Sequence, residues 1–259
     1  MIPVALTIAG SDPSGGAGIQ ADLKTFHQMG AFGMSVITLL TVQNTQRVDE
    51  VDVLMPEFAV AQLDAVLEDI APGAAKTGAL GDAPMIEAIA RRAERFDFPL
   101  VVDPVMISKH GAELLPAAAV DSLRKKLLPR AFLVTPNIYE AAALAGFEVK
   151  DVAGMERAAE AINRLGPKNV LVKGGVLLGE AVDVLWTNGR IHRVTAEHIP
   201  TRQTHGTGCV YSAAITALLA SGLELRAAVT QAKAFITEAI RTAPGLGKGL
   251  GPINIHAKP

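Results

Sequence analysis

The residue types best suited to chemistry stand near the end of the chain, in the run Thr204-His205-Gly206-Thr207-Gly208-Cys209. An alanine-rich helical pattern, 210–219, follows directly. A glycine-bearing loop that runs into a helix start directs free backbone N–H groups at one point, and the helix dipole adds partial positive charge there. Cys209 is the only cysteine, and a thiol at a helix N-terminus tends to have a lowered pKa, which suits a base or nucleophile. An anion site beside an activated thiol predicts phosphoryl transfer.

Two acidic residues and a lysine are candidates for the other parts of such a site. Asp103 and Glu140 stand at or just past predicted strand ends. Each alone is more often a cap or turn residue, but beside a phosphate site the two could hold Mg²⁺ through water. Lys173 closes an apolar strand before Gly174-Gly175. Its ammonium group could reach phosphate oxygens or simply emerge into solvent.

Two further segments suit a small-molecule ligand. The loop 10–18, GSDPSGGAG, is either a flexible turn or a place where a ligand approaches bare backbone. It matches neither the dinucleotide fingerprint nor a Walker A loop. Gln43-Asn44-Thr45 carries amides that can pair with the edge of a heterocycle, although this composition is also common in loops. His205 is either a phosphate contact or a loop residue, and the other histidines lack metal-ligand spacing.

The composition narrows the class of protein. With 259 residues, 49% hydrophobic and 19% charged, the chain can bury a large core, which argues against disorder. The net charge of −2 gives no basic excess for a nucleic-acid partner. No apolar run reaches the length of a membrane span, and the start of the chain reads as a buried strand rather than a signal peptide. One cysteine allows no internal disulfide, which fits a reducing cytoplasm.

Strand-like and helical patterns alternate along the chain, which predicts an α/β protein with a mostly parallel central sheet and helices on both faces. No linker or repeat divides it, so residues 1–259 are expected to form a single domain. The ligand of such a sheet lies beyond the carboxyl ends of its strands; the candidates at predicted strand ends are Gly10, Gln43, Asp103, Asn137 and Lys173. We predict strands at 4–9, 35–40, 74–77, 100–102, 132–135, 170–173, 182–187 and 190–195, and helices at 19–29, 58–70, 85–95, 120–128, 139–144, 155–165, 210–220 and 226–242.

Several motifs together resemble one enzyme family. Residues 9–26, AGSDPSGGAGIQADLKTF, closely resemble the N-terminal signature of the hydroxymethylpyrimidine/phosphomethylpyrimidine kinases of thiamine biosynthesis, which are ribokinase-like enzymes. The resemblance covers essentially the whole chain. The later motifs, in the family's order, are Gln43-Asn44-Thr45, Asp103-Pro104-Val105-Met106, Thr135-Pro136-Asn137 with Glu140, Lys173-Gly174-Gly175, His205-Gly206-Thr207-Gly208-Cys209 and Gly247-Lys248-Gly249-Leu250-Gly251-Pro252.

The resemblance implies a three-layer ribokinase-like kinase domain that uses ATP and Mg²⁺, in a cytoplasmic homodimer. Its substrate would be 4-amino-5-hydroxymethyl-2-methylpyrimidine and then the monophosphate of that alcohol. Cys209 matches the catalytic position, with Gly206, Thr207 and Gly208 supplying N–H groups to the developing negative charge. The expected substrate contacts are Gln43, Gly10, Val105, Ala17 and Ala79. The expected ATP and Mg²⁺ contacts are Asp103, Asn137, Glu140, Lys173, Thr204 and His205, with Asp103 and Glu140 on the metal.

Two alternatives and one departure remain at this point. Relatives commonly carry a bulkier methionine near Ala79, on the pyrimidine side of the site. A smaller residue there could loosen the wall of the substrate site, which weakens any expectation of strict substrate selectivity. Related pyridoxal kinases share the Gly-Thr-Gly-Cys loop, and a non-catalytic binding module is a more distant alternative. No fused thiamine-phosphate synthase domain is expected at the C-terminus. The segments 107–115 and 245–251 are candidates for loops that close over a substrate.

Overall fold

The computed structural model describes residues 2–107, 111, 114–175 and 181–258. The candidate closing loop at 107–115 therefore lies largely outside the described residues. A nine-stranded sheet runs through the molecule in the order β3-β2-β1-β4-β5-β6-β7-β8-β9. The strands are β1 Val4–Ser11, β2 Phe32–Gln43, β3 Val48–Val53, β4 Ala74–Thr77, β5 Leu100–Val102, β6 Leu133–Val134, β7 Asn169–Lys173, β8 Ala181–Thr187 and β9 Arg190–Ala196.

The six strands in sheet order from β2 to β7 are parallel, and the antiparallel pairs lie at the two sides of the sheet, where β3 pairs with β2, β8 with β7, and β9 with β8. The mostly parallel sheet is therefore confirmed. The chain moves outward from β1 to β2 and then continues on the other side of β1 with β4. The strand order reverses between β1 and β4, and the crevice beyond the carboxyl ends of such neighbouring strands is where open α/β sheets bind ligands.

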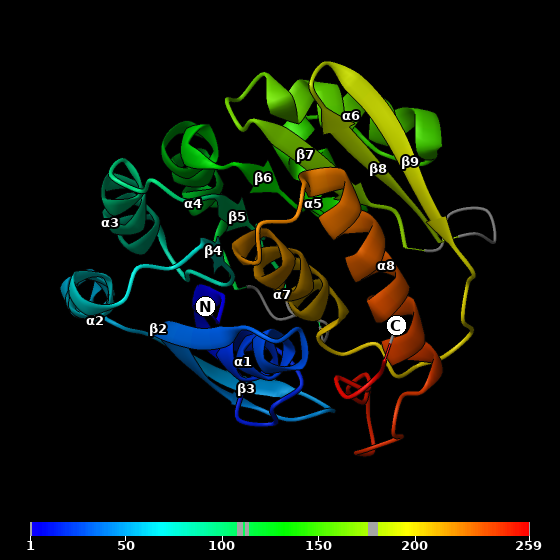
Figure 1. The fold of residues 1–259 in the computed structure, drawn as a ribbon, viewed down its shortest axis with the longest axis horizontal. Helices are drawn as coiled ribbons and strands as arrows, with labels where there is room; N and C mark the ends of the chain where they lie inside the picture. The colour runs from blue at the N-terminus through cyan, green and yellow to red at the C-terminus, as the bar shows by residue number, and fades with distance from the viewer. Residues whose placement is uncertain (1, 108–110, 112–113, 176–180, 259) are drawn as a thin grey trace.

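Helices cover both faces of the sheet (Figure 1). On one face α1, α7 and α8 pack side by side, and the other helices cover the opposite face. The helices are α1 Gly18–Gln28, α2 Pro56–Asp69, α3 Ala83–Ala93, α4 Ala117–Ser122, α5 Ile138–Ala145, α6 Val152–Asn163, α7 Thr207–Ala220 and α8 Leu225–Arg241.

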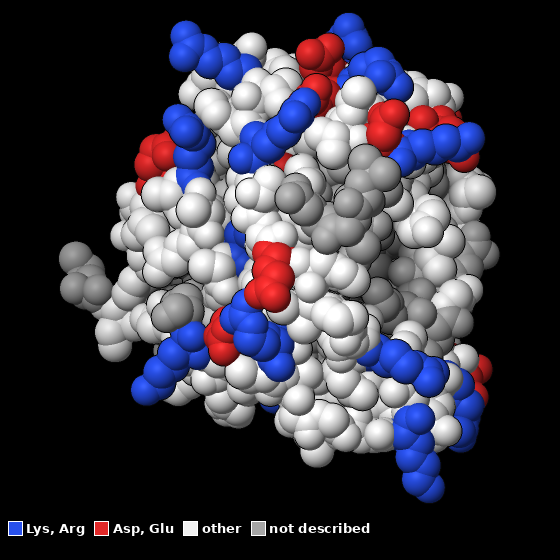
Figure 2. All heavy atoms as spheres, turned by 90° about the vertical axis from the view of Figure 1, so that its right-hand side faces the viewer, with Lys and Arg blue, Asp and Glu red and all other residues white. Residues whose placement is uncertain are grey.

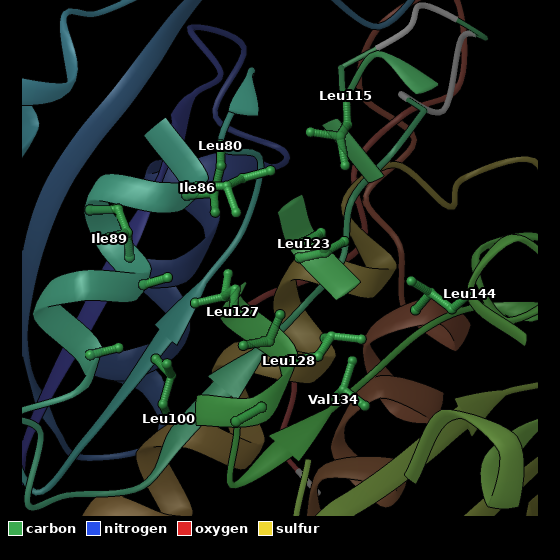
Figure 3. Packing of buried hydrophobic residues seen from close by; sticks show 14 of the residues in the cluster. Leu80, Ile86, Ile89, Leu100, Leu115, Leu123, Leu127, Leu128, Val134 and Leu144 are labelled. Atoms are coloured by element: carbon green, nitrogen blue, oxygen red, sulfur yellow. The ribbon is translucent and has the colours of Figure 1, made fainter. Parts of the chain in front are cut away.

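The alternation of side chains along each strand builds a core on each face. Val102 and Val134 point into the larger core with α3 and α5, whereas Val101 and Leu133 point to the opposite core under α7 and α8. Figure 3 shows the first of these cores, where Ile86 and Ile89 of α3 face Leu127 and Leu128. Two apolar faces on one strand explain why the central strands read as continuous hydrophobic runs.

The structure shifts the ends of several predicted elements, such as β2 and α6, and three further differences change an element's type or bear on the site. Strand β3, VDEVDV, was not predicted, because its acidic residues on an exposed edge lack the usual strand composition. The predicted helix 120–128 is instead the end of α4 followed by a π-helical turn, Leu123–Leu127, and a 3₁₀ turn, Leu128–Arg130. Helix α7 begins at Thr207 rather than 210, so Cys209 lies inside its first turn.

Candidate active site

The loop before α7 has the geometry of an anion site. Gly206 caps the helix with φ of 76°, and a Cβ at this position would overlap the carbonyl oxygen of Gly16. Among the described residues, the N–H groups of Gly208 and Cys209 have no hydrogen-bond acceptor, as expected in the first turn of a helix. These amides are therefore available to a negatively charged group.

Lys173 and Asp103 lie directly beside these amides. Lys173 Nζ lies 3.3 Å, and Asp103 Oδ2 3.9 Å, from the place that a Cβ on Gly208 would take. Lys173 Nζ donates to Asp103 Oδ1 over 2.8 Å. Thr135 Oγ1 and Ser212 Oγ also donate to the two oxygens of this carboxylate, over 3.1 Å each. Lys173 therefore does not emerge into solvent: it is held at the anion loop.

Glu140 completes the charged cluster. Its Oε2 accepts the backbone N–H of Asn137, and the Asn137 side chain accepts the N–H groups of Tyr139 and Glu140, which together cap α5. Burial raises the pKa of Glu140 to about 7, with Lys173 opposing the shift and Asp103 adding to it. The carboxyl group therefore changes charge near neutral pH, and the side-chain oxygen of Asn137 is occupied by the cap.

The carboxylates fit a magnesium ion only in a water-rich arrangement. Within the described parts of the chain, no three His, Cys, Asp or Glu side chains converge on a point that could hold a metal. Mg²⁺ is often held by one or two carboxylates, with waters and substrate phosphates as its other ligands. Asp103 and Glu140, which interact electrostatically across the cluster, suit that arrangement.

The environment of Cys209 differs from the sequence prediction. Burial raises the pKa of the thiol to about 11, and Asp22 and Asp103 add to the shift. The Lys76 ammonium and a backbone hydrogen bond from Gly18 oppose it. The expected lowered pKa is therefore wrong, because the desolvation of this partly buried thiol outweighs the favourable charge at the helix start.

A buried ion pair between Lys76 and Asp22 interacts with the site. Lys76, at the end of β4, and Asp22 of α1 have fully buried side chains, and their charged atoms lie 2.7 Å apart. Thr7 Oγ1 donates to the other oxygen of Asp22 over 2.6 Å. Lys76 interacts electrostatically with Cys209 and Asp103. A positive charge therefore acts on the Cys209 thiol.

The N-terminal loop folds around Asp12 and contacts the anion loop through His205. Asp12 accepts hydrogen bonds from the backbone of Ser14 and Ala17, each over 2.9 Å, and from the Ser14 hydroxyl over 2.7 Å. Its Oδ2 also lies 2.7 Å from His205 Nε2. Gln43 Nε2, at the end of β2, lies 3.3 Å from the same ring nitrogen. The structure thus brings Ala17, Gln43 and His205 together.

The other expected contacts, Gly10, Ala79 and Val105 for the substrate and Thr204 for ATP, lie at or just after strand ends or directly before α7. A Cβ on Gly18 would overlap the carbonyl oxygen of Gly10, so the loop passes very close to the end of β1. Gly78 packs against Ala9 of β1, which places the adjoining Ala79 beside the same strand. The Val105 N–H donates to the Asp103 carbonyl oxygen over 2.9 Å. The backbone of Thr204 accepts from the Thr207 hydroxyl over 2.8 Å at the start of α7.

The glycine-rich segment 245–251 is hydrogen-bonded to Thr45 and His205. Leu250 N–H donates to the Thr45 carbonyl oxygen over 2.8 Å, and His205 N–H donates to the Gly251 carbonyl oxygen over 3.0 Å. Close backbone contacts with Thr45 require glycine at 249. The segment therefore covers the loop after β2.

Sequence reasoning did not assign site roles to several buried polar residues. Asp12 and Asp22 lie within the motif 9–26, whose composition does not indicate that they are buried. Lys76 follows Ala74-Ala75, and a charge inside this apolar stretch is the signal that could have found it. Ser212 and Thr135 bind the Asp103 carboxylate; as small hydroxyl residues they give no signal in a single sequence.

The charged surface is mixed, and the described helices stay short of membrane dimensions. On the face shown in Figure 2, Lys and Arg side chains are interspersed with Asp and Glu. Among the described residues, no helix has both the length and the apolar character needed to cross a bilayer.

The comparison with known proteins decides between the enzyme families that such a site allows. Residues 12–254 match the family described as phosphomethylpyrimidine kinase. The chain belongs to this kinase family. It is 47% identical over 254 residues to a hydroxymethylpyrimidine/phosphomethylpyrimidine kinase of Synechococcus elongatus, covering 97% of each chain. The resemblance seen in the sequence motifs is therefore confirmed.

Two other relatives of this family member bear on its function. The chain is 49% identical over 251 residues to a thiamine biosynthesis bifunctional protein of Geobacter sulfurreducens, and it spans about half of that protein's length, 51%. Its structure also matches a pyridoxal kinase of Bacillus subtilis in complex with ADP, with a TM-score of 0.93 and 40% identity over 99% of this chain and 98% of that one. The α/β kinase fold is therefore confirmed, and a nucleotide bound to a structural neighbour agrees with ATP use.

Proposed function

We propose that this kinase transfers the terminal phosphoryl group of ATP to 4-amino-5-hydroxymethyl-2-methylpyrimidine and then to the resulting monophosphate. Family membership over nearly the whole chain supports this proposal. The single observation that carries it is the convergence of the free α7 amides, Lys173 and Cys209 at one edge of the sheet. An anion site beside a proton acceptor meets the requirements of phosphoryl transfer to an alcohol.

Each group has a role in this proposal. The N–H groups of Gly208 and Cys209 bind the transferred phosphoryl group as its charge develops. The Thr207 N–H, which the sequence also suggested for this role, instead donates to the Thr204 carbonyl oxygen over 3.4 Å. Lys173 neutralises phosphate oxygens, and Asp103 fixes the position of its ammonium group. Asp103 and Glu140 would hold Mg²⁺, which supplies charge neutralisation between phosphates when bound. Asn137 caps the helix that presents Glu140, so its contribution to the nucleotide site is indirect.

Cys209 in its thiolate form accepts the hydroxyl proton of the first substrate. An alcohol is a very weak acid, so the first transfer benefits from a base. A phosphate monoester has its second pKa at about 6 and is already mostly dianionic at neutral pH. The second transfer therefore needs no base, and the two steps depend differently on Cys209.

Pyridoxal kinase is the second candidate, because a pyridoxal kinase is a close structural match. Gln43 favours the aminopyrimidine, since an amide can both donate to a ring nitrogen and accept from an exocyclic amino group. The test compares ADP release with the pyrimidine alcohol, its monophosphate and pyridoxal. A higher kcat/KM for pyridoxal would replace the proposal, and no turnover with any of the three would favour a non-catalytic binding protein.

We further propose a homodimer that works in the cytoplasm, as the family resemblance implies. Analytical ultracentrifugation of the purified protein gives its mass in solution, and fractionation of the source cells gives its compartment. A monomer across the concentration range of the assay, or recovery outside the cytoplasm, would contradict this part of the proposal.

A further inference from the structure

In the contacts that link Asp12, His205 and Gln43, the donor and the acceptor of each hydrogen bond can be assigned. Asp12 is 3% exposed and His205 is 2% exposed, so the pair is screened from solvent. Ser14 and Ala17 donate three hydrogen bonds to the Asp12 carboxylate. All the surrounding groups thus treat Asp12 as an acceptor, and the ring nitrogen that faces its Oδ2 over 2.7 Å must carry the hydrogen.

The protonation of Asp12 agrees with this assignment. Burial opposes ionisation, but the hydrogen bonds from His205 and Ser14 lower the pKa of Asp12 below its ordinary value. The carboxylate is therefore charged at neutral pH. His205 consequently donates its Nε2–H to Asp12.

The Nε2–H group of His205 also determines which end of the Gln43 side-chain amide faces the ring. Gln43 Nε2 lies 3.3 Å from His205 Nε2, and in this orientation of the amide two N–H groups would face each other. Rotation of the amide by half a turn places its oxygen, the only end that can accept, toward the His205 Nε2–H. Because the ring nitrogen carries a single hydrogen, Asp12 and Gln43 then share it in a three-centre hydrogen bond. The NH₂ group then points away from His205, and the oxygen keeps a second lone pair.

We propose that Asp12 and His205 are specificity-determining positioning residues, which orient the Gln43 amide so that its NH₂ group donates to a ring nitrogen of the substrate. This inference rests on the proposed function. The substrate edge that fits is an acceptor nitrogen beside an amino donor, as in a 4-aminopyrimidine. An oxo compound with a ring N–H beside a carbonyl oxygen offers the reverse pattern and is rejected.

The backbone of the loop 10–18 allows the His205 ring to approach Asp12. A Cβ on Gly16 would overlap the His205 ring, so the approach of the ring to Asp12 requires glycine there. His205 also donates its backbone N–H to Gly251 over 3.0 Å and directly precedes Gly206. The residue that orients the recognition amide therefore also fixes the first residue of the anion loop. Recognition of the ring and placement of its hydroxymethyl group are thus coupled.

The test measures selectivity with Asp12→Asn. The probes are 4-amino-5-hydroxymethyl-2-methylpyrimidine and its 4-oxo analogue, each assayed for kcat and KM at saturating ATP. In Asp12→Asn the side-chain NH₂ can face His205, whose ring then presents a lone pair and turns the Gln43 amide around. We expect the amino-to-oxo ratio of kcat/KM to fall at least about tenfold, since the reversed amide loses a hydrogen bond to the amino compound and leaves a buried donor mismatched. The loss should appear mainly in KM of the amino compound.

Matched variants separate this role from a structural one. Ser14→Ala removes one hydrogen bond to the other oxygen of the same carboxylate and should leave the amino-to-oxo ratio unchanged. Gln43→Glu cannot donate and should lower the ratio as Asp12→Asn does, which keeps the test decisive if Asp12→Asn does not fold. Calorimetric binding of the amino compound without ATP supplies a readout that does not depend on turnover.

Each outcome bears on the inference. If Asp12→Asn and Gln43→Glu lower activity on both compounds by the same factor, Asp12 and His205 only hold two loops together and the inference is wrong. If the wild-type protein phosphorylates neither compound, the proposed function itself fails. A wild-type preference for the amino compound that both variants lose supports the inference.

Discussion

The elevated pKa of Cys209 gives the most discriminating prediction about the chemistry. Burial raises the pKa of the thiol to about 11. At pH 7 only about one molecule in 10⁴ then carries the thiolate that can accept a proton. Each rise of one pH unit increases that fraction about tenfold. We therefore expect kcat/KM for the pyrimidine alcohol to rise about tenfold per unit between pH 7 and pH 9, and kcat/KM for the monophosphate to stay nearly constant.

The single cysteine allows a direct check of the thiol itself. Iodoacetamide can alkylate only Cys209, and the alkylation rate follows the thiolate fraction. A shift from 9.0 to about 11 corresponds to about 3 kcal/mol against the charged form. At pH 7.5 we expect alkylation about 100-fold slower than for free cysteine, rising without a plateau up to pH 10.

The matched variant is Cys209→Ala, which removes the base without adding a charge. We expect a loss of about 10²–10⁴-fold in kcat for the alcohol, a much smaller loss for the monophosphate, and no remaining pH slope. The base role is refuted if wild-type turnover of the alcohol is flat between pH 7 and 9, or if the variant loses equal kcat on both substrates. Either result would leave Cys209 as a packing or positioning residue.

Three other predictions follow from the charges and the backbone of the site. Lys76→Met leaves the Asp22 carboxylate buried without its ion-pair partner, so we expect the free energy of unfolding in urea to fall by about 3–5 kcal/mol. Recovery of stability in the double variant with Asp22→Leu would confirm the cause. An unchanged urea midpoint for Lys76→Met would contradict it. In Gly206→Ala, a residue with φ of 76° carries a Cβ that meets the backbone of Gly16. We therefore expect at least about 1–2 kcal/mol of destabilisation and a higher KM for ATP. Wild-type values of both quantities would show that the loop accommodates the methyl group without strain. Burial raises the pKa of Glu140 to about 7, so its carboxylate loses its charge as the pH falls from 8 to 6 and KM for Mg·ATP should rise. Glu140→Gln can still accept the Asn137 N–H and should lack this pH dependence. An identical dependence in the variant would remove Glu140 from the metal site.

The sequence by itself determined the fold class and most of the elements. Strands β4 and β5 lie where their apolar patterns predict them, at Ala74–Thr77 and Leu100–Val102. Hydrophobic periodicity is a local property that a single sequence carries in full. It failed for β3, whose acidic residues on an open edge need no apolar side chain. The candidates Lys173 and Asp103 were also readable, because parallel strands end at one edge of the sheet and so bring their following residues together.

Only the tertiary structure decided how those residues are paired and charged. His205 and Asp12 are 193 positions apart in the chain, and Lys76 and Asp22 are 54 apart, so no local pattern predicts that they meet. The pKa of Cys209 was predicted with the wrong sign, because the helix start that lowers it is visible in the sequence and the burial that raises it is not. Backbone geometry follows from short-range preferences, whereas desolvation and ion pairing depend on which distant segments the fold brings into contact.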